Sequence, residues 1–208
     1  MRKLLTAAIM AVSSIMLCGC RGSESIFNGR DLEGWVCVTS SEDSVSSEAG
    51  PTFSVVDGAL HISGHPFGYI RTAKSYSDYV LTLEWRWAGE KRADSGIFNR
   101  IQEGDKVWPA GVQCQMRESD FGFFFSPLPL EGVEGDGFYR KGNLCKSDPE
   151  LPDGEWNTAE FTCKGSHISA VVNGVLVNEA DCSATEGYIG FQSEGGAIEF
   201  RSIRLRKL

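Results

Sequence analysis

The clearest pattern in the chain is Tyr79-Val80-Leu81-Thr82-Leu83-Glu84-Trp85-Arg86-Trp87. Every second residue, from Tyr79 to Trp87, is large and apolar. Successive side chains of a β-strand point to opposite faces, so these residues share one face. The stretch therefore predicts a strand that buries one face in a core and carries Glu84 and Arg86 on the other.

Further segments on both sides of this stretch have the length and composition of strands. Asp57-Gly58 and Asn173-Gly174 separate pairs of them and are typical of two-residue hairpin turns. No segment after the N-terminal region has a helical period, and no internal repeat is present. Short strands joined by glycine-rich turns predict an all-β fold, an antiparallel jelly-roll sandwich. The other predicted strands are Thr52–Val56, Ala59–Ser63, Tyr69–Thr72, Ile97–Ile101, Gly111–Met116, Trp156–Lys164, Ile168–Val172, Val175–Asn178, Gly187–Gln192 and Ile198–Leu205.

The N-terminus has the features of an exported lipoprotein. Two basic residues precede a mostly apolar stretch, Leu4–Leu17, which is too short to span a bilayer and suits the core of a signal peptide. It ends in Leu17-Cys18-Gly19-Cys20, which resembles a lipobox. We expect residues 1–19 to be the signal, Cys20 to carry the lipid, residues 20–25 to be a tether and residues 26–208 to be the folded domain. Because Arg21 rather than Asp follows the lipidated cysteine, we expect an extracytoplasmic protein anchored at the bacterial outer membrane.

Charge and cysteine usage exclude several kinds of partner. The formal net charge is −8. The only basic cluster is at the C-terminus, where Arg201, Arg204, Arg206 and Lys207 alternate with apolar residues, so nucleic acid is not an expected partner. The three histidines do not form a ligand-like cluster, and no cysteine pair has metal-ligand spacing, so we expect no metal and no cofactor. Five cysteines remain in the predicted domain, and we expect them to be buried free thiols. They are Cys37, Cys114, Cys145, Cys163 and Cys182.

Two strands carry long polar side chains on the face opposite their apolar residues. Glu84 and Arg86 share such a face, and Gln113 and Gln115 share another. Sugar hydroxyls need paired donors and acceptors, so a sheet lined with these side chains suits a sugar-binding groove. The alternative is a solvated outer face, on which Glu84 and Arg86 form cross-strand ion pairs.

An ordered set of short motifs resembles the bacterial 3-keto-disaccharide hydrolase domain family across nearly all of the predicted domain. No single motif is specific, but their order is. The motifs are Ile26-Phe27-Asn28-Gly29-Arg30-Asp31-Leu32-Glu33-Gly34-Trp35, Leu83-Glu84-Trp85-Arg86, Asp94-Ser95-Gly96-Ile97-Phe98-Asn99-Arg100, Asp105-Lys106-Val107-Trp108-Pro109, Gly154-Glu155-Trp156-Asn157, Val172-Asn173-Gly174, and Gly190-Phe191-Gln192-Ser193-Glu194-Gly195-Gly196 with Ile198-Glu199-Phe200-Arg201.

The resemblance implies a concanavalin-like jelly roll and an enzyme that cleaves glycosides of 3-keto sugars, by hydrolysis or by elimination. The chain departs from the family at Gln113, where members carry Glu, and an amide cannot act as a base. Asp94 stands where members often have Asn, and Phe121–Phe125 is unusually aromatic.

A ketone at carbon 3 acidifies the hydrogen on carbon 2, so such a site needs a base, an enolate-stabilising donor and an acid for the leaving group. The carboxylates that can supply a base or acid are Glu84, Asp94, Glu118 and Glu194. Arg86 or Arg100 can hold the enolate oxygen, and Trp108 can stack on a sugar. We predict Glu84, Arg86 and Gln113 as catalytic residues and Arg100, Trp108, Gln115 and Glu194 as substrate-binding residues. The alternative, without a functional role, is that Glu194 is an ordinary loop carboxylate and that Trp108 is a core residue.

Two classes of function stay open. The first is an enzyme on oxidised glycosides, and the second is a carbohydrate-binding lipoprotein that has lost catalysis through the change at Gln113. In both, the partner is a carbohydrate and the lipid anchor holds the protein to a membrane. Both predict that Glu84, Arg86, Gln113 and Gln115 converge on one groove, with Trp108 and Glu194 near its rim.

Overall fold

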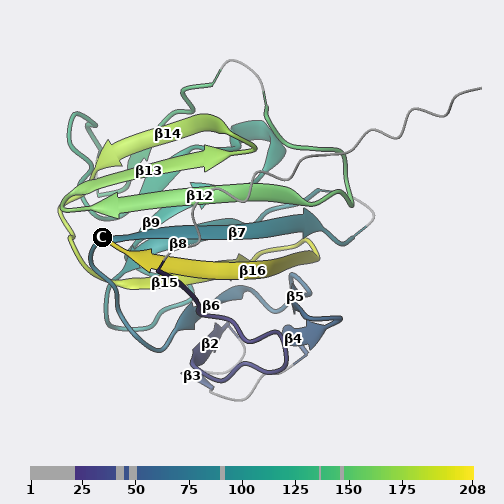
Figure 1. Ribbon diagram of the computed structural model, residues 1–208. Helices are drawn as coiled ribbons and strands as arrows, with labels where there is room; N and C mark the ends of the chain where they lie inside the picture. The colour runs from purple at the N-terminus through teal and green to yellow at the C-terminus, as the bar shows by residue number, and fades with distance from the viewer. Residues whose placement is uncertain (1–21, 41–44, 47–50, 90–91, 136, 146–147) are drawn as a thin grey trace, which may run out of the picture.

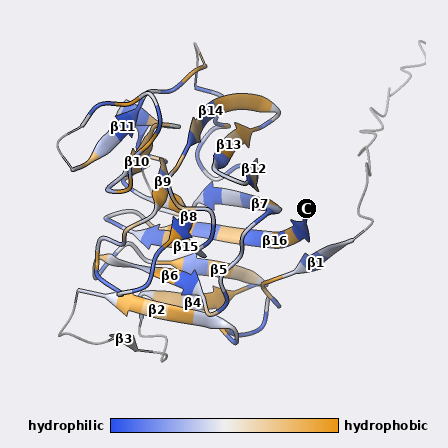
Figure 2. Ribbon diagram, turned by 90° about the vertical axis from the view of Figure 1, so that its left-hand side faces the viewer, coloured by the Kyte–Doolittle hydropathy of each residue, from blue (hydrophilic) through white to orange (hydrophobic). Residues whose placement is uncertain are grey.

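The protein is a sandwich of two antiparallel sheets. The computed structural model describes residues 22–40, 45–46, 51–89, 92–135, 137–145 and 148–208. One sheet has the order β14-β13-β12-β7-β16-β5-β4, with β1 also paired to β16, and is called sheet A here. The other, sheet B, has the order β11-β10-β9-β8-β15-β6-β2-β3. The two sheets lie face to face (Figure 1), and a view from the side shows them as two layers (Figure 2).

The strands of sheet A are β1 (Ser23–Ser25), β4 (Phe53–Val56), β5 (Ala59–Ile62), β7 (Tyr79–Trp87), β12 (Asn157–Lys164), β13 (His167–Val172), β14 (Val175–Asp181) and β16 (Ile198–Lys207). The strands of sheet B are β2 (Trp35–Thr39), β3 (Val45–Ser46), β6 (Gly68–Thr72), β8 (Gly96–Ile101), β9 (Val112–Gln115), β10 (Phe124–Ser126), β11 (Tyr139–Lys141) and β15 (Tyr188–Ser193). The described residues contain one short 3₁₀ helix, Glu118–Asp120.

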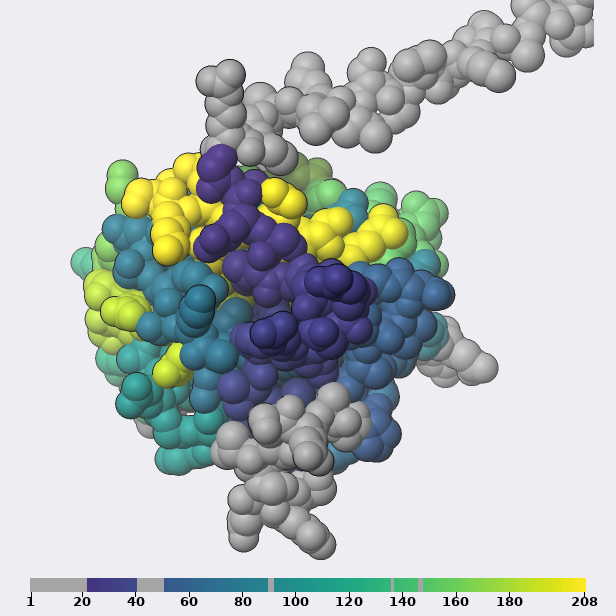
Figure 3. Space-filling model, turned by 60° about the horizontal axis from the view of Figure 1, so that its bottom comes forward, coloured from purple at the N-terminus to yellow at the C-terminus, as the bar shows by residue number. Residues whose placement is uncertain are grey.

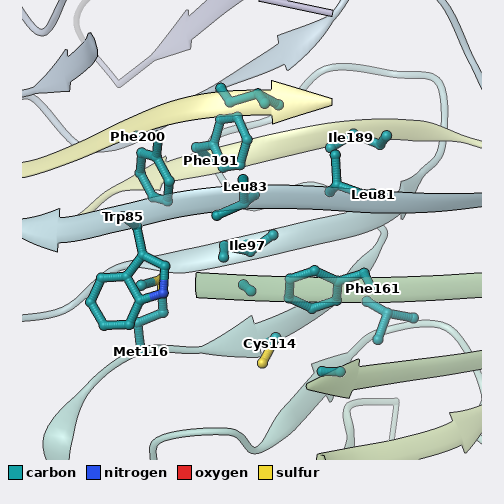
Figure 4. Close-up of a cluster of buried hydrophobic side chains, with 14 of the residues drawn as sticks. Leu81, Leu83, Trp85, Ile97, Cys114, Met116, Phe161, Ile189, Phe191 and Phe200 are labelled. Carbon is teal, nitrogen blue, oxygen red and sulfur yellow. The ribbon is translucent and has the colours of Figure 1, made fainter. Parts of the chain in front are cut away.

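Strand β7 lies in the middle of sheet A, between β12 and β16. Leu81 and Trp85 have no exposed surface and Leu83 is 3 % exposed, which confirms the predicted apolar face. These side chains point from β7 toward Ile97, Met116 and the other labelled residues of the core between the sheets (Figure 4). Burial of this face, together with the apolar faces of the other strands of both sheets, forms the core and drives folding.

All the predicted strands are present within one or two residues at most ends, and the predicted jelly-roll sandwich is confirmed. The two hairpin turns are also confirmed, because Asp57, Gly58, Asn173 and Gly174 all have positive φ, as this turn type requires. The sequence analysis missed β1, β2, β3, β10 and β11. These strands are five residues or shorter, and a short segment shows too little alternation to be recognised.

The N-terminal strand β1 pairs with β16, so the beginning and end of the folded part lie together. Figure 3 shows the purple N-terminal residues packed against the yellow C-terminal strand. Ser23–Ser25 therefore belongs to sheet A, although these residues fall within the predicted tether. Residues 1–21, including the predicted signal and Cys20, lie outside the described residues.

The five cysteines of the folded part are free thiols, and all except Cys145 are buried. Burial raises the pKa of Cys37 to about 11 and that of Cys114 to about 12, so these thiols stay protonated at neutral pH. They pack as small apolar side chains. Among the described residues, no helix is long and apolar enough to cross a membrane.

Candidate functional site

A pocket of about 280 Å³ opens on the outer face of sheet B. Residues of β8, β9 and β15 form its floor, and the segments that join the strands form its walls. The lining residues are Asp94, Phe98, Trp108, Pro109, Gly111, Gln113, Gln115, Arg117, Phe125, Pro127, Phe138, Gln192 and Glu194. Four residues that we predicted for the site are among them, namely Gln113, Gln115, Trp108 and Glu194.

Three glutamines form the polar part of the floor. Gln113 Nε2 donates hydrogen bonds to Gln192 Oε1 (2.9 Å) and to Gln115 Oε1 (3.2 Å). The Gln113 side chain lies over Gly96 of the neighbouring strand, and a Cβ at that position would collide with it. Glycine at 96 therefore leaves the room in which the three amides meet, and the network fixes their orientation.

Two acidic residues stand at one end of this floor. The backbones of Asp94 and Glu194 pair in an isolated antiparallel bridge, which places both side chains in the pocket wall. Gln192 Nε2 donates to Glu194 Oε2 at 2.7 Å. The other oxygen, Oε1, accepts no hydrogen bond from the described residues, so it is free to meet a substrate. Glu194 is thus joined through Gln192 to Gln113.

Arg117 is the cation of the site. Its Nη1 lies 3.3 Å from Asp94 Oδ2, and its Nη2 lies 2.6 Å from Asp120 Oδ2. The hydrogen bond from Arg117 holds the pKa of Asp120 below its usual value. Asp120 fixes one edge of the guanidinium, and the charge of Arg117 acts on Glu194 by lowering its pKa, against the effect of burial.

Burial makes the two carboxyls of the pocket weaker acids than usual. It is the main cause that raises the pKa of Glu194 to about 7, and the nearby charge of Asp94 adds to it. Burial also raises the pKa of Asp94, whose Oδ1 is buried without a hydrogen-bond partner, while Arg117 opposes the shift. A carboxyl that titrates near neutral pH is suited to move protons.

Aromatic side chains form the other end of the pocket. Trp108 is 52 % exposed and Phe138 is 47 % exposed, so Trp108 is not a core residue. The segment that carries Trp108 is held to sheet B by Asp105, which binds Arg71 Nε (2.7 Å) and the Tyr69 hydroxyl (2.9 Å). Phe138 directly precedes β11, the edge strand of the sheet.

Glu84 and Arg86 do not reach this pocket. They lie on β7 in sheet A, whereas Gln113 and Gln115 lie on β9 in sheet B, so the expected groove joining all four is wrong. Each strand turns its apolar face toward the core, so their polar faces point away from each other on opposite sides of the sandwich.

The outer face of sheet A instead carries paired charges. Glu84 Oε2 accepts from Arg201 Nε at 2.7 Å, and Arg86 Nε donates to Glu199 Oε2 at 2.8 Å. Both arginines also cover the ring of Trp156, at 4.5 Å for Arg86 and 3.8 Å for Arg201. An open depression of about 410 Å³ borders Glu84, and no aromatic side chain lines it. The cross-strand ion-pair alternative describes this face.

Arg100 and Glu118 are also absent from the pocket lining. Arg100 has a positive φ of 59° beside the bulge where β8 meets β15, and it has no exposed surface. The bulge changes the alternation, so its side chain is buried and donates from Nη2 to the Gly165 carbonyl (3.0 Å). Its expected contact with a sugar is therefore not formed. Glu118 lies exposed in the 3₁₀ helix.

The sequence analysis missed Arg117, Gln192, Phe125 and Phe138. Arg117 continues the alternation of Gln113 and Gln115 by one further step, so extending that pattern would have identified it. Gln192 and Glu194 are also two residues apart, one near the end of β15 and the other directly after it. Nothing local marked Phe138, because only the tertiary fold places it near Trp108.

Residues suited to hold a metal ion are not gathered anywhere in the described part of the chain, where no group of three His, Cys, Asp or Glu side chains forms. The polar end of the pocket instead combines amides, two carboxyls and one guanidinium. Such a set can bind hydroxyl and carbonyl oxygens and can exchange a proton at Glu194.

The fold is that of the concanavalin-like glucanases and carbohydrate-binding modules. The chain resembles a candidate glycosyl hydrolase from Parabacteroides distasonis (TM-score 0.66, 20 % identity, 90 % of this chain and 94 % of that one). It also resembles a carbohydrate-binding module from Bacillus subtilis (TM-score 0.61, 15 % identity, 84 % and 96 % covered). A third similar structure is the β-glucanase of Bacillus licheniformis (TM-score 0.59, 13 % identity, 91 % and 100 % covered). At these identities the likeness shows the fold alone.

Residues 22–206 match the model of the 3-keto-alpha-glucoside-1,2-lyase-like domain, and the chain belongs to this family. The match confirms the family resemblance drawn from the ordered motifs. A comparison with curated protein sequences finds no significant match.

Proposed function

We propose that the protein is an enzyme that cleaves glycosides whose sugar carries a ketone at carbon 3, with Glu194 as the base that removes the hydrogen from carbon 2. The observation that carries the proposal is the Glu194 carboxyl at the pocket wall, with one free oxygen and a pKa raised to about 7. Membership of the 3-keto-alpha-glucoside-1,2-lyase-like family supports the substrate class.

In the proposed reaction, Glu194 takes the proton from carbon 2, and the electrons of that bond form the enolate of the neighbouring ketone. Arg117 faces the developing oxyanion with a charge that it keeps at every working pH. The enolate then collapses, a double bond forms between carbons 1 and 2, and the bond from carbon 1 to the leaving oxygen breaks. The protonated Glu194 returns its proton to that oxygen. Addition of water across the new double bond would complete a hydrolysis.

The amide network positions the base. Gln192 donates to one oxygen of Glu194, and Gln113 in turn donates to Gln192, so the carboxyl is held in one orientation. Gln113 thus has a positioning role in this proposal, in place of the catalytic carboxylate that family members carry there. Gln115 accepts from the Met116 backbone (3.0 Å) and completes the network.

The test uses a methyl 3-keto-glucoside carrying either hydrogen or deuterium at carbon 2. We expect the purified protein to cleave it, to react more slowly with the deuterated form, and to leave the unoxidised methyl glucoside intact. An elimination releases a conjugated enone that absorbs in the ultraviolet, whereas a hydrolysis releases 3-keto-glucose. Cleavage of the unoxidised glucoside, or no cleavage of the 3-keto form, would contradict the proposal.

The second candidate function is carbohydrate binding without catalysis, which is favoured by one observation, the amide at position 113. The variant Gln113→Glu distinguishes the two candidates. A carboxylate there would face the Oε1 atoms of Gln115 and Gln192, which now accept from Gln113. If Glu194 is the base, Gln113→Glu disturbs its support and lowers turnover. Turnover that appears only in Gln113→Glu would instead identify the natural protein as a binding module.

We also propose that Cys20 carries a lipid that anchors the protein outside the cytoplasm, at the outer membrane. The support is the sequence alone: a basic start, a short apolar core and a terminal cysteine. The variant Cys20→Ser should lose both lipid labelling and membrane association while the domain still folds. Lipid labelling of the Ser variant would refute the assignment.

A further inference from the structure

The pocket has two unlike halves, and the strand register sets where each lies. Gly96 is paired with Gln115 and Asn99 with Val112, so the chain crosses the pocket from Gly111, directly before β9, to Gln115 at the other end of that strand. All the charged lining groups lie near the Gln115 end. The aromatic half, which lies toward Gly111, is lined by Trp108, Pro109, Pro127 and Phe138. Phe98 and Phe125 flank Gln113 where the two halves meet.

The side chains of the aromatic half offer almost no hydrogen bonds. Apart from the indole N–H of Trp108, they carry no donor or acceptor. A second sugar ring can stack its apolar face on Trp108, but its hydroxyls would find almost no hydrogen-bond partners among these side chains. A flat aromatic ring would instead bury its own apolar surface against that of the wall, and so remove both surfaces from water.

Trp108 and Phe138 form exposed walls of the pocket and do not belong to the core. Both are about half exposed, although large aromatic side chains usually bury most of their surface. Each packs against another ring. The ring centroids of Trp108 and Phe67 are 6.3 Å apart, and those of Phe138 and Phe125 are 5.9 Å apart. Phe125 is itself held under the Arg140 guanidinium at 4.5 Å. The backing rings keep the walls in place before a ligand arrives.

We propose that the aromatic half binds the leaving group, and that the enzyme selects glycosides of planar aromatic alcohols over disaccharides. This inference rests on the proposed function, which assigns the 3-keto sugar to the half that contains Glu194. The pocket volume of about 280 Å³, at the small end of ligand sites, limits the ligand to about one sugar with one further ring of either kind.

The selection is measured by calorimetric binding of three unoxidised glucosides of the same anomer: phenyl, methyl and glucosyl. Turnover does not enter this measurement, so leaving-group reactivity cannot imitate a preference. We expect the phenyl glucoside to bind about tenfold more tightly than the methyl glucoside, as one stacked ring can provide. We expect the disaccharide to bind no more tightly than the methyl glucoside.

Two variants locate the effect. Trp108→Ala and Phe138→Ala should each reduce the ratio of phenyl to methyl affinity toward one, with little change in methyl glucoside affinity. Leu176→Ala is the matched control, because Leu176 is an exposed apolar residue (41 %) on β14 of sheet A, and it should leave the ratio unchanged.

Equal affinity for phenyl and methyl glucosides, tighter binding of the disaccharide, or no binding of the phenyl glucoside would overturn the inference. The proposed function is tested separately by cleavage of the 3-keto substrate. Cleavage without phenyl preference removes only the leaving-group inference, and phenyl preference without cleavage removes the enzyme assignment and leaves an aryl-glucoside binding protein.

Discussion

The outer faces of the two sheets start from the same sequence pattern and become different surfaces. Each has a strand with alternating apolar and long polar side chains, β7 in sheet A and β9 in sheet B. On sheet A, Glu84 and Arg86 meet oppositely charged partners on the adjacent strand β16. On sheet B, Gln113 and Gln115 lie at the bottom of a pocket whose walls come from other segments.

The difference comes from the segments around each strand. Asp94 precedes β8, Glu194 follows β15, and Trp108 and Phe138 come from two separate connections. These segments rise around β9 and partly bury Glu194, and this burial raises the pKa of its carboxyl. A polar strand face therefore becomes a reactive site only where its neighbours enclose it.

The largest expected difference between the faces is in catalysis. Glu194→Gln removes the proposed base and should lower kcat/KM for a 3-keto-glucoside by about 10²–10⁴-fold. Glu84→Gln makes the same chemical change on sheet A and should leave kcat/KM unchanged. Steady-state kinetics on both variants tests the comparison. If Glu84→Gln proved the more damaging change, the assignment of the site to sheet B would be wrong.

The core that both faces share should show the largest effect on stability. Trp85→Ala removes a fully buried side chain and should lower the free energy of unfolding by about 3–5 kcal/mol. The lower part of this range is expected, because the buried Trp85 Nε1 has no hydrogen-bond partner to lose. Trp108→Ala is the control, since a half-exposed Trp should matter little to denaturant unfolding. Equal losses would show that Trp108 is a structural residue.

The pH dependence of kcat/KM should report the burial of Glu194. A base must be ionised, so kcat/KM should rise about tenfold per pH unit below the pKa of about 7 and level off above it. Asp94→Asn removes a negative neighbour and should move the midpoint to lower pH. The midpoint should stay above the usual range of glutamate, because burial is the larger cause. An activity that falls as pH rises through 7 would make Glu194 an acid instead.

The smallest effect is expected on the outer face of sheet A. Arg86→Ala breaks the ion pair with Glu199 and the contact with Trp156, but Arg86 is 38 % exposed at its side chain. We expect a loss of about 1–3 kcal/mol in the free energy of unfolding, because Glu199, which is 10 % exposed at its side chain, loses its arginine partner. Turnover should not change. A large loss of turnover would mean that this face contributes to the reaction.

The sequence by itself determined the sandwich and the faces on which the polar side chains of β7 and β9 lie. Strand periodicity is a local property, so the alternation from Tyr79 to Trp87 predicts burial of Leu81, Leu83 and Trp85 without knowledge of the partners. The Asp57-Gly58 and Asn173-Gly174 turns are equally local. Each turn needs positive φ only at its two central residues, and Asp, Asn and Gly accept this conformation. The ordered motifs also identified the family before any geometry was known.

Only the tertiary structure decided which polar faces meet. Periodicity tells inside from outside, but it does not say which sheet a strand joins, and β7 and β9 joined different ones. It also fails at a bulge, where Arg100 turned inward against its expected direction. The enclosure that raises the pKa of Glu194, the charge of Asp94 that adds to the shift and the charge of Arg117 that opposes it come from distant parts of the chain. Burial and charge act through space, and so the chemistry of the pocket depends on contacts that no local pattern contains.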